Sequence, residues 1–285
     1  MVRDYSVIAK EAMMPDIKIQ IKNLYKIFGS NDKKMISHVE GGMGKPELLE
    51  QHGHVLALKD VNIDVPAKGV QVIMGLSGSG KSTLIRHINR LIEPTSGEML
   101  VDGNDVLSMS DADLEHFRRF QASMVFQNFA LFPHKTILEN GMYGLKVQGQ
   151  KDDQARPKAQ KWLDRVGLSG FENHYPAQLS GGMQQRVGLA RALSTDADIL
   201  LMDEAFSALD PLIRTDMQDV LLDLQKELHK TVIFITHDLD EALRIGDNIA
   251  ILRDGEVVQQ GDPQDIILNP ADEYVLSLIH ISEPT

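Results

Sequence analysis

The segment GLSGSGKST, Gly75–Thr83, decides how the rest of the chain is interpreted. It matches the phosphate-binding loop pattern G-x-x-x-x-G-K-[ST]. The run VQVIM before it is typical of a buried strand, and STLIRHINRLI after Lys81 has apolar residues at helical spacing. A strand, a glycine loop and a helix form the context in which this pattern binds phosphate, so a chance glycine turn explains it poorly.

The residues of this loop predict a nucleoside triphosphate bound with Mg²⁺. Glycines let the backbone turn tightly, so that successive N–H groups face an anion at the start of a helix near Lys81. Lys81 is expected to bridge the β and γ phosphates, Ser82 to join the Mg²⁺ shell, and Thr83 to contact the α-phosphate. The loop residues expected to bind the nucleotide are Gly75, Ser77, Gly78, Ser79, Gly80, Lys81, Ser82 and Thr83.

A second group of polar residues ends the apolar run ILLMDE, Ile199–Glu204. Two carboxylates at the end of a buried strand are costly unless they meet a cation or solvent. Asp203 is therefore a candidate Mg²⁺ partner. Glu204 suits a general base that polarises a water molecule toward the γ-phosphate. Strands ending in Asp-Glu are common, so the functional interpretation of these two residues depends on the phosphate loop upstream.

A Ser-Gly-Gly turn opens the segment LSGGMQQRVGLARAL, Leu179–Leu193. Ser180 is predicted to be the N-cap of a helix whose free N–H groups form a second anion site. Since the chain has a single Lys-bearing phosphate loop, the simplest explanation is that this site binds the nucleotide of another copy. An ordinary capped helix is the alternative.

Taken together, these segments resemble the ATP-binding subunit of ABC transporters, whose signature reads LSGG about twenty residues before the Asp-Glu strand. The resemblance implies that Ser180, Gly181, Gly182 and Met183 bind nucleotide across a dimer. It also implies that Gln127 senses Mg²⁺ and the γ-phosphate, and that His237 contacts the γ-phosphate beside the base. Asp210 would lie at the dimer seam and Phe28 would stack on adenine. Considered singly, Gln127 and His237 are as well explained as polar residues near the core.

Details of several segments narrow the resemblance to importers of osmoprotectants. HINRLIEPTSGEMLVDG, LSGGM, DEAFSALDPLIRTDMQ and HDLDEALRIGDNIAIL are similar to glycine betaine/proline betaine importers of the ProV type, with choline importers just behind. This implies two identical ATPase subunits on the cytoplasmic face of the membrane, two permease subunits and an external binding protein. Relatives of this type usually continue into regulatory CBS modules, and this chain ends soon after NPADEYV.

The expected fold class is α/β, a P-loop NTPase of the ABC ATPase kind. A RecA-like parallel sheet would carry an antiparallel β-subdomain, indicated by DIKIQIK and VLALKDVNIDV, and a helical subdomain over about 128–192. The domain is predicted to span 16–277, with a family-type insertion at 30–54. Residues 1–15 are expected to be a flexible N-terminus, and 278–285 a tail of truncated or foreign sequence.

Composition excludes several classes of protein. Net charge is −12, which repels nucleic acid and anionic lipid. The absence of Cys rules out disulfides and thiol chemistry. The N-terminus lacks the apolar core of a signal peptide, so the protein is expected to stay inside the cell. No apolar run reaches the ~18 to 20 residues of a spanning helix, so a membrane partner would have to supply the span.

Three alternatives stay open. A soluble ABC-type ATPase of DNA repair or translation usually carries two ATPase units or a long coiled coil. A P-loop kinase or GTPase working alone leaves LSGGM unexplained and predicts no ATP-driven dimer. An importer for another solute, such as an amino acid or a polyamine, is compatible with the same residues, because this subunit does not touch the solute.

Overall fold

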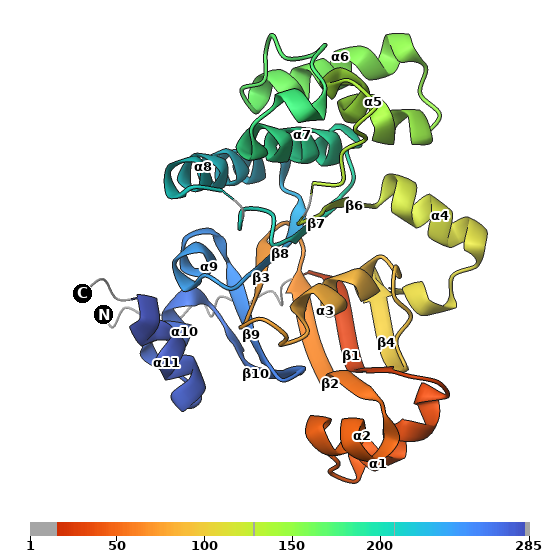
Figure 1. Ribbon diagram of the computed structural model, residues 1–285, viewed down its shortest axis with the longest axis vertical. Helices are drawn as coiled ribbons and strands as arrows, with labels where there is room; N and C mark the ends of the chain where they lie inside the picture. The colour runs from red at the N-terminus through yellow and green to blue at the C-terminus, as the bar shows by residue number, and fades with distance from the viewer. Residues whose placement is uncertain (1–15, 128, 208, 283–285) are drawn as a thin grey trace, which may run out of the picture.

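The computed structural model describes residues 16–127, 129–207 and 209–282. The segment 1–15, predicted to be flexible, lies outside the described residues, and so do the last three residues of the predicted tail. Within the described part, strands form two sheets, one mostly parallel and one antiparallel (Figure 1).

Six strands form the larger sheet. Its order is β10 (Glu256–Gly261), β9 (Asn248–Arg253), β3 (Val70–Met74), β8 (Thr231–Thr236), β7 (Ile199–Asp203) and β6 (Ala122–Val125). All neighbouring strands are parallel except β10 and β9, which form an antiparallel hairpin around Asp254 and Gly255, a residue pair typical of hairpin turns. Every residue of β3, β7 and β8 is buried, which explains their continuous apolar runs.

The smaller sheet is antiparallel throughout. Its order is β2 (Val55–Pro66), β1 (Ile17–Phe28), β4 (Ser96–Val101) and β5 (Asn104–Asp105). Buried and exposed residues alternate along β2, as expected for a strand with one face on the core. Helix α3 (Lys81–Ile88) lies between the two sheets, because its residues Leu84, Ile85 and Ile88 share one hydrophobic core with strands of both.

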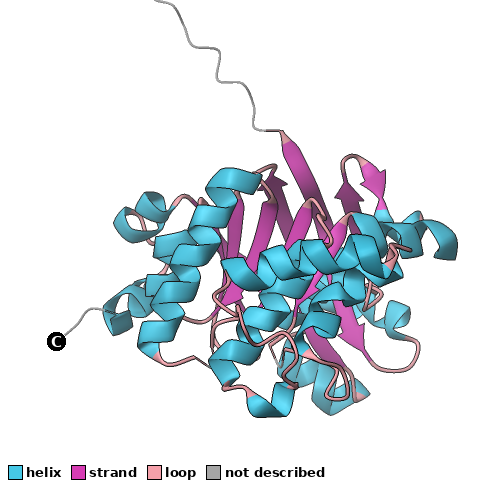
Figure 2. Cartoon of the chain, turned by 90° about the horizontal axis from the view of Figure 1, so that it is seen from above, coloured by secondary structure: helices cyan, strands magenta, loops and turns pink. Residues whose placement is uncertain are grey.

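The remaining helices gather in separate regions of the molecule. They are η1 (Asp32–Met35), α1 (Ile36–Glu40), α2 (Lys45–His52), η2 (Val106–Ser108), α4 (Asp111–Phe120), α5 (Ile137–Val147), α6 (Asp152–Arg165), η3 (Pro176–Gln178), α7 (Gly181–Ser194), α8 (Pro211–Leu228), α9 (Leu239–Ile245), α10 (Pro263–Leu268) and α11 (Glu273–Ser282). Helices α5, α6 and α7 cluster at one end of the molecule and α1 and α2 at the opposite end (Figure 1). Seen from above, helices cover the sheets (Figure 2). Among the helices of the described residues, none is both long and apolar enough to cross a bilayer.

Two helix boundaries differ from the sequence pattern. The apolar spacing of Val220, Leu221, Leu224 and Leu228 predicts a helix from Asp216 to Leu228. The helix, α8, begins at Pro211 instead, because the side chain of Asp210 accepts a hydrogen bond from Ile213 N and caps it. The helix after the phosphate loop ends at Ile88, before the end of its apolar pattern, and Arg90 has a φ of 52°. A left-handed residue cannot continue an α-helix.

Both segments set apart by sequence are folded where the structure describes them. The 30–54 insertion forms η1, α1 and α2, and Val39 and Leu48 pack with Ile27 and Leu56 of the flanking strands. Helix α11 runs through residue 277, the predicted end of the domain. Leu278, the first residue of the predicted tail, is buried in the main core.

We predict that His87 makes folding sensitive to mild acid. Its side chain is fully buried in α3, and burial lowers its pKa to about 4. A depressed histidine pKa adds stability that is complete above about pH 6.5, where the unfolded chain is also neutral, and that is lost as pH falls toward 4. Between these values the free energy of unfolding should fall by about 3 kcal/mol on this account. Urea titrations of His87→Asn should show a flatter pH dependence than wild type; equal slopes would contradict the prediction.

Candidate functional site: a phosphate-binding loop and its carboxylates

The phosphate loop lies between β3 and α3, as predicted. Gly80 has a φ of 105°, and a Cβ atom there would lie 2.7 Å from the carbonyl oxygen of Ala57. Gly78 has a φ of 81°. Both values are in the region that favours glycine, so these residues set the turn that leads into the helix.

Lys81 is the first residue of α3, and its side chain is only 4% exposed. Its Nζ atom donates to the carbonyl oxygens of Gly75, at 2.7 Å, and Leu76, at 3.0 Å. It also lies 3.7 Å from Glu204 Oε1. Burial lowers the pKa of the ammonium, and Glu204 opposes that shift. The amine is therefore folded back over its own loop, beside the positive end of a helix dipole, which is suitable for an anion.

Asp203 ends strand β7 and is fully buried. Its two carboxylate oxygens accept hydrogen bonds from Ser82 Oγ at 2.7 Å and from Arg86 Nη2 at 3.1 Å. Ser82 and Arg86 lie one helical turn apart on α3, so one face of this helix satisfies the carboxylate. Arg86 was not predicted from sequence, although its i,i+4 spacing from Ser82 would have placed it on that face.

Glu204 is where the predicted catalytic residues meet. It has a φ of 45°, just beyond the end of β7. Its Oε2 atom accepts a hydrogen bond from Gln127 Nε2 at 3.0 Å and lies 3.8 Å from His237 Nδ1, while Oε1 faces Lys81. Three predicted residues from separate segments, Lys81, Gln127 and His237, thus lie within 3.8 Å of the Glu204 carboxylate.

His237 is positioned by a buried network behind it. It follows β8, whose last residue, Thr236, contacts Glu241 through its hydroxyl group and accepts a hydrogen bond from Asp238 N. Glu241 also accepts a hydrogen bond from Gln218, and burial raises the pKa of its carboxyl group. Sequence reasoning did not identify this network.

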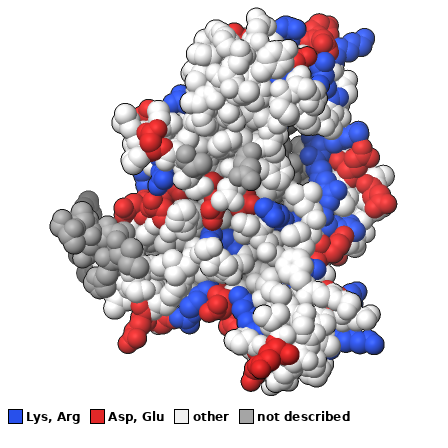
Figure 3. All heavy atoms as spheres, in the orientation of Figure 1, with Lys and Arg blue, Asp and Glu red and all other residues white. Residues whose placement is uncertain are grey.

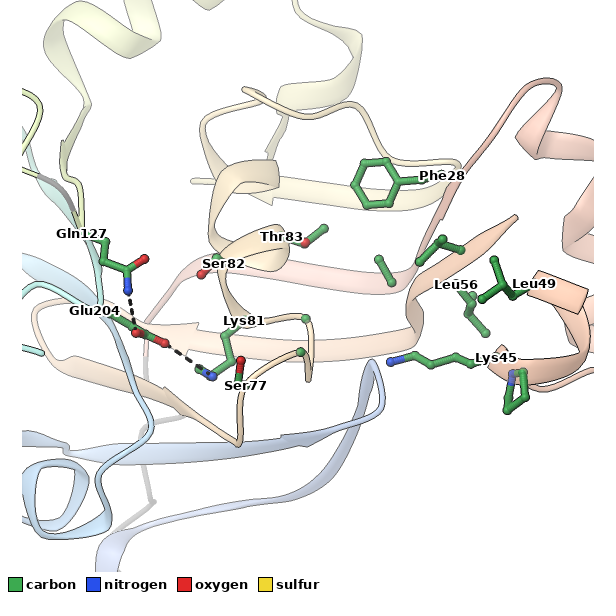
Figure 4. Close-up of a pocket in the computed structure, with 15 residues that line it drawn as sticks. Phe28, Lys45, Leu49, Leu56, Ser77, Lys81, Ser82, Thr83, Gln127 and Glu204 are labelled. Carbon is green, nitrogen blue, oxygen red and sulfur yellow. Dashed lines mark hydrogen bonds and ion pairs between the residues drawn. The ribbon is translucent and has the colours of Figure 1, made fainter. Parts of the chain in front are cut away.

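One pocket of about 780 Å³ runs from Phe28 to this cluster. Phe28 lies at one end, 41% exposed, with Lys26 Nζ 4.9 Å from its ring centre. Gln127, Lys81 and Glu204 lie at the other end (Figure 4). The predicted residues that line the pocket are Phe28, Ser77, Gly78, Gly80, Lys81, Ser82, Thr83, Gln127 and Glu204. Three lining residues, Lys45, Pro46 and Leu49, come from the insertion and were not predicted.

Other predicted residues lie beside the pocket instead of lining it. The side chain of Ser79 is buried, and its carbonyl oxygen accepts a hydrogen bond from Gly255 N at 2.9 Å. Gly75 supplies the carbonyl that holds Lys81, and Asp203 lies behind Ser82. These residues support the loop.

The signature residues form a separate hollow of about 550 Å³. Ser180 is the N-cap of α7, and its hydroxyl oxygen accepts a hydrogen bond from Met183 N at 3.3 Å, as predicted. This hollow is lined by Gly167, Leu168, Ser180, Gly181, Gly182, Met183, Arg186, Leu209, Asp210 and Ile213. Among the residues that the structure describes, none lines both this hollow and the pocket of the phosphate loop. Within one chain the two anion-binding segments therefore do not share a site.

The donor set near the loop fits a magnesium ion with few protein ligands. The Ser82 hydroxyl and the Asp203 carboxylate are oxygen donors 2.7 Å apart, and oxygen is the ligand atom that Mg²⁺ prefers. Among the described residues, no group of three or more His, Cys, Asp or Glu side chains is arranged to hold a metal. At phosphoryl-transfer sites Mg²⁺ keeps several water ligands and takes others from one or two carboxylates and the substrate phosphates.

Comparison with known proteins agrees with this geometry. Residues 58–207 match the family model for ABC transporters. The glycine betaine transport ATP-binding protein OpuAA of Bacillus subtilis is 57% identical over 91% of this chain and 62% of its own length. The glycine betaine/proline betaine transport system ATP-binding protein ProV of Escherichia coli is 54% identical over 91% of this chain and 65% of its own.

A solved structure shows the same fold. It is the dimeric, post-hydrolysis state of the ATP-binding cassette MJ0796 bound to ADP and Pi, with a TM-score of 0.73 and 34% identity over 86% of this chain and 98% of that one. The site and fold are those of a P-loop nucleotide-binding protein. The chain belongs to the ABC transporter family, which confirms the predicted family and fold class. It spans less than two thirds of the length of the two transport proteins.

Proposed function

We propose that this chain is the ATP-hydrolysing subunit of an ABC importer for quaternary-amine osmoprotectants such as glycine betaine, proline betaine or choline. The observation that carries the ATPase assignment is the convergence of Lys81, Gln127 and His237 on the Glu204 carboxylate at one end of a pocket that is open enough for a nucleotide. The assignment of the solute class rests on the names of the transport proteins to which the chain is similar.

The pocket suggests one orientation for ATP. Phe28 offers an exposed aromatic face for adenine, and the loop lies at the other end, where its N–H groups and Lys81 suit the β and γ phosphates. Ser77 and Thr83 line the path between them. Lys81 now bonds two carbonyls of its own loop and faces Glu204. A γ-phosphate would compete for this ammonium and free the carboxylate for catalysis.

Hydrolysis needs a base beside the γ-phosphate. In the proposed reaction, Glu204 takes a proton from water as the water oxygen bonds to the γ-phosphorus. The bond from that phosphorus to the β–γ bridging oxygen then breaks, giving ADP and phosphate. His237 and Gln127 are close enough to Glu204 to orient it and the water. Ser82, Gln127 and Asp203 would hold Mg²⁺, which when bound neutralises developing phosphate charge.

A second copy would complete the site. Ser180 to Met183 offer helix N–H groups, but these line a different hollow from the phosphate loop of the same chain. A head-to-tail dimer would place the signature of each copy over the nucleotide of the other, with Asp210 at the seam. The dimeric state of the solved cassette bound to ADP and Pi supports this arrangement.

Transport requires further subunits at the cytoplasmic face of the membrane. We propose two integral-membrane permease subunits that contact the region around Gln127 and the following segment LFPHKTILEN, and an external binding protein that delivers the solute. Nucleic acid is a poor partner: the net charge is −12, and acidic and basic side chains are interspersed on the face shown in Figure 3. An importer of an amino acid or polyamine is the alternative that the same site allows.

Two substitutions should separate nucleotide binding from hydrolysis. Glu204→Gln should bind ATP but lower its turnover about a hundredfold or more, and leave a stable dimer in the presence of ATP. Lys81→Ala should weaken ATP binding by about ten- to a hundredfold, because charged hydrogen bonds to phosphate are lost. Steady-state phosphate release measures the turnover, calorimetry measures the affinity for ATP, and light scattering measures the dimer. If Glu204→Gln hydrolyses ATP at nearly the wild-type rate, Glu204 is not the general base. If Lys81→Ala binds ATP with unchanged affinity, Gly75–Thr83 is not the loop that binds its phosphates.

Uptake of labelled solutes tests the importer assignment. Cells that express this subunit with its cognate permease and binding protein should accumulate glycine betaine or choline, and Glu204→Gln should abolish the uptake. Labelled methionine and spermidine serve as the amino acid and polyamine comparisons. Uptake of one of these instead, with ATPase activity intact, would discard the osmoprotectant assignment and keep the ABC mechanism.

A further inference from the structure

The insertion replaces what would otherwise be a tight turn next to the nucleotide pocket. Phe28, the last residue of β1, pairs with Val55, the first residue of β2, in the antiparallel sheet. Two strands in that register need only a few residues to connect them. Here the connection is residues 29–54, which fold into η1, α1 and α2. A folded segment therefore stands directly beside the proposed adenine-stacking residue.

Several contacts fix this segment to the strands. Leu48 of α2 is fully buried in a small core with Ile27 and Leu56. The two ring nitrogens of His54 lie 2.6 Å from the carbonyl oxygen of His52 and 2.8 Å from that of Ser30, at the two ends of the insertion. At its start, Thr95 Oγ1 donates to Asp32 Oδ2 at 2.6 Å. Helix α2 is thus held by both its buried face and its flanking loops.

An adjoining face of α2 forms part of the pocket wall. Lys45, Pro46 and Leu49 line the pocket, although they lie about 30 residues before the phosphate loop in sequence. Leu49 is 54% exposed, whereas its neighbour Leu48 is buried. Figure 4 shows Phe28 on one side of the pocket and Leu49 and Lys45 on the other, with Lys45 extended toward the loop. An exposed leucine opposite an exposed aromatic ring leaves an apolar slot open at this end.

Lys45 is available to a ligand. Among the described residues its one ion pair is with Asp254 in the β9–β10 turn, at 3.8 Å, and the Asp254 side chain is 79% exposed. An ion pair this long and this exposed contributes little stability. A polyphosphate close to Lys45 would compete for the ammonium.

We propose that α2 is the second wall of the nucleotide site: Leu49 packs on the base from the side opposite Phe28, and Lys45 attracts the phosphates. This inference rests on the proposed ATP-binding function and assigns part of that site to the insertion. It predicts that the two side chains act differently. Leu49 strengthens binding only of ligands that carry a base, whereas Lys45 strengthens binding of any polyphosphate and does so less at high salt.

The test uses ATP and inorganic tripolyphosphate as probes in calorimetric titrations of the full chain. Leu49→Ala should weaken ATP binding about five- to tenfold, because the substitution removes three carbon atoms and with them part of the apolar contact with the base. Tripolyphosphate has no base, so its binding should not change. Leu268→Ala, at a leucine of α10 that is 74% exposed, is the matched control and should change neither.

A second pair of variants tests the charge. Lys45→Ala should weaken both probes about two- to fivefold at low salt and flatten the salt dependence. Lys34→Ala, at an exposed lysine of the same insertion, is the control and should change neither the affinity for the two probes nor its salt dependence. Wild-type affinity for ATP in both Leu49→Ala and Lys45→Ala, with ATP binding weakened in Lys81→Ala as predicted above, would overturn this inference and leave the proposed function standing. Failure of the wild-type chain to bind either probe would overturn both.

Discussion

A buried ammonium held beside a buried strand end is the feature on which the site depends. Lys81 is almost fully enclosed, and its charge is balanced by two loop carbonyls and Glu204. The same residue begins α3, so the helix dipole adds to its field. Removing this many polar groups from water is unfavourable unless each finds a partner. A phosphate group could accept hydrogen bonds from the Lys81 ammonium and from loop N–H groups, and it would compete there with the two carbonyls and Glu204.

The parallel sheet brings the other residues to that point. Strands β3, β7 and β8 are adjacent and parallel, so the loop after β3, Glu204 after β7 and His237 after β8 emerge at one edge. The strands themselves are wholly buried, and the partly exposed side chains of Glu204 and His237 follow directly after the carboxyl ends of β7 and β8. The antiparallel sheet contributes differently: it fixes the start of the insertion next to Phe28 and so places α2 over the open end of the pocket.

How far sequence predicts this protein depends on whether a residue acts through local geometry or through packing. The loop glycines, the Ser180 cap and the Asp-Glu strand end were predicted because their roles follow from spacing within one turn or strand. Lys45 and Leu49 had no such signal, since only the folding of the insertion brings them to a pocket defined elsewhere in the chain. The start of α8 lies outside the apolar spacing of that helix, because the Asp210 cap and Pro211 set it.

In the proposed dimer, each chain holds two incomplete halves of a nucleotide site, which a second copy unites. Retention of labelled ATP by mixed dimers tests it, using Glu204→Gln chains that also carry either Lys81→Ala or Ser180→Glu. Neither chain alone should retain ATP, whereas the mixture should retain about one ATP per mixed dimer, because one intact loop then faces one intact signature. Ser110→Glu is the control, because it removes the same kind of helix cap from α4. Added to the Glu204→Gln chain, it should leave ATP retention unchanged. No retention by the mixture, or full retention by the Ser180→Glu chain alone, would contradict the account.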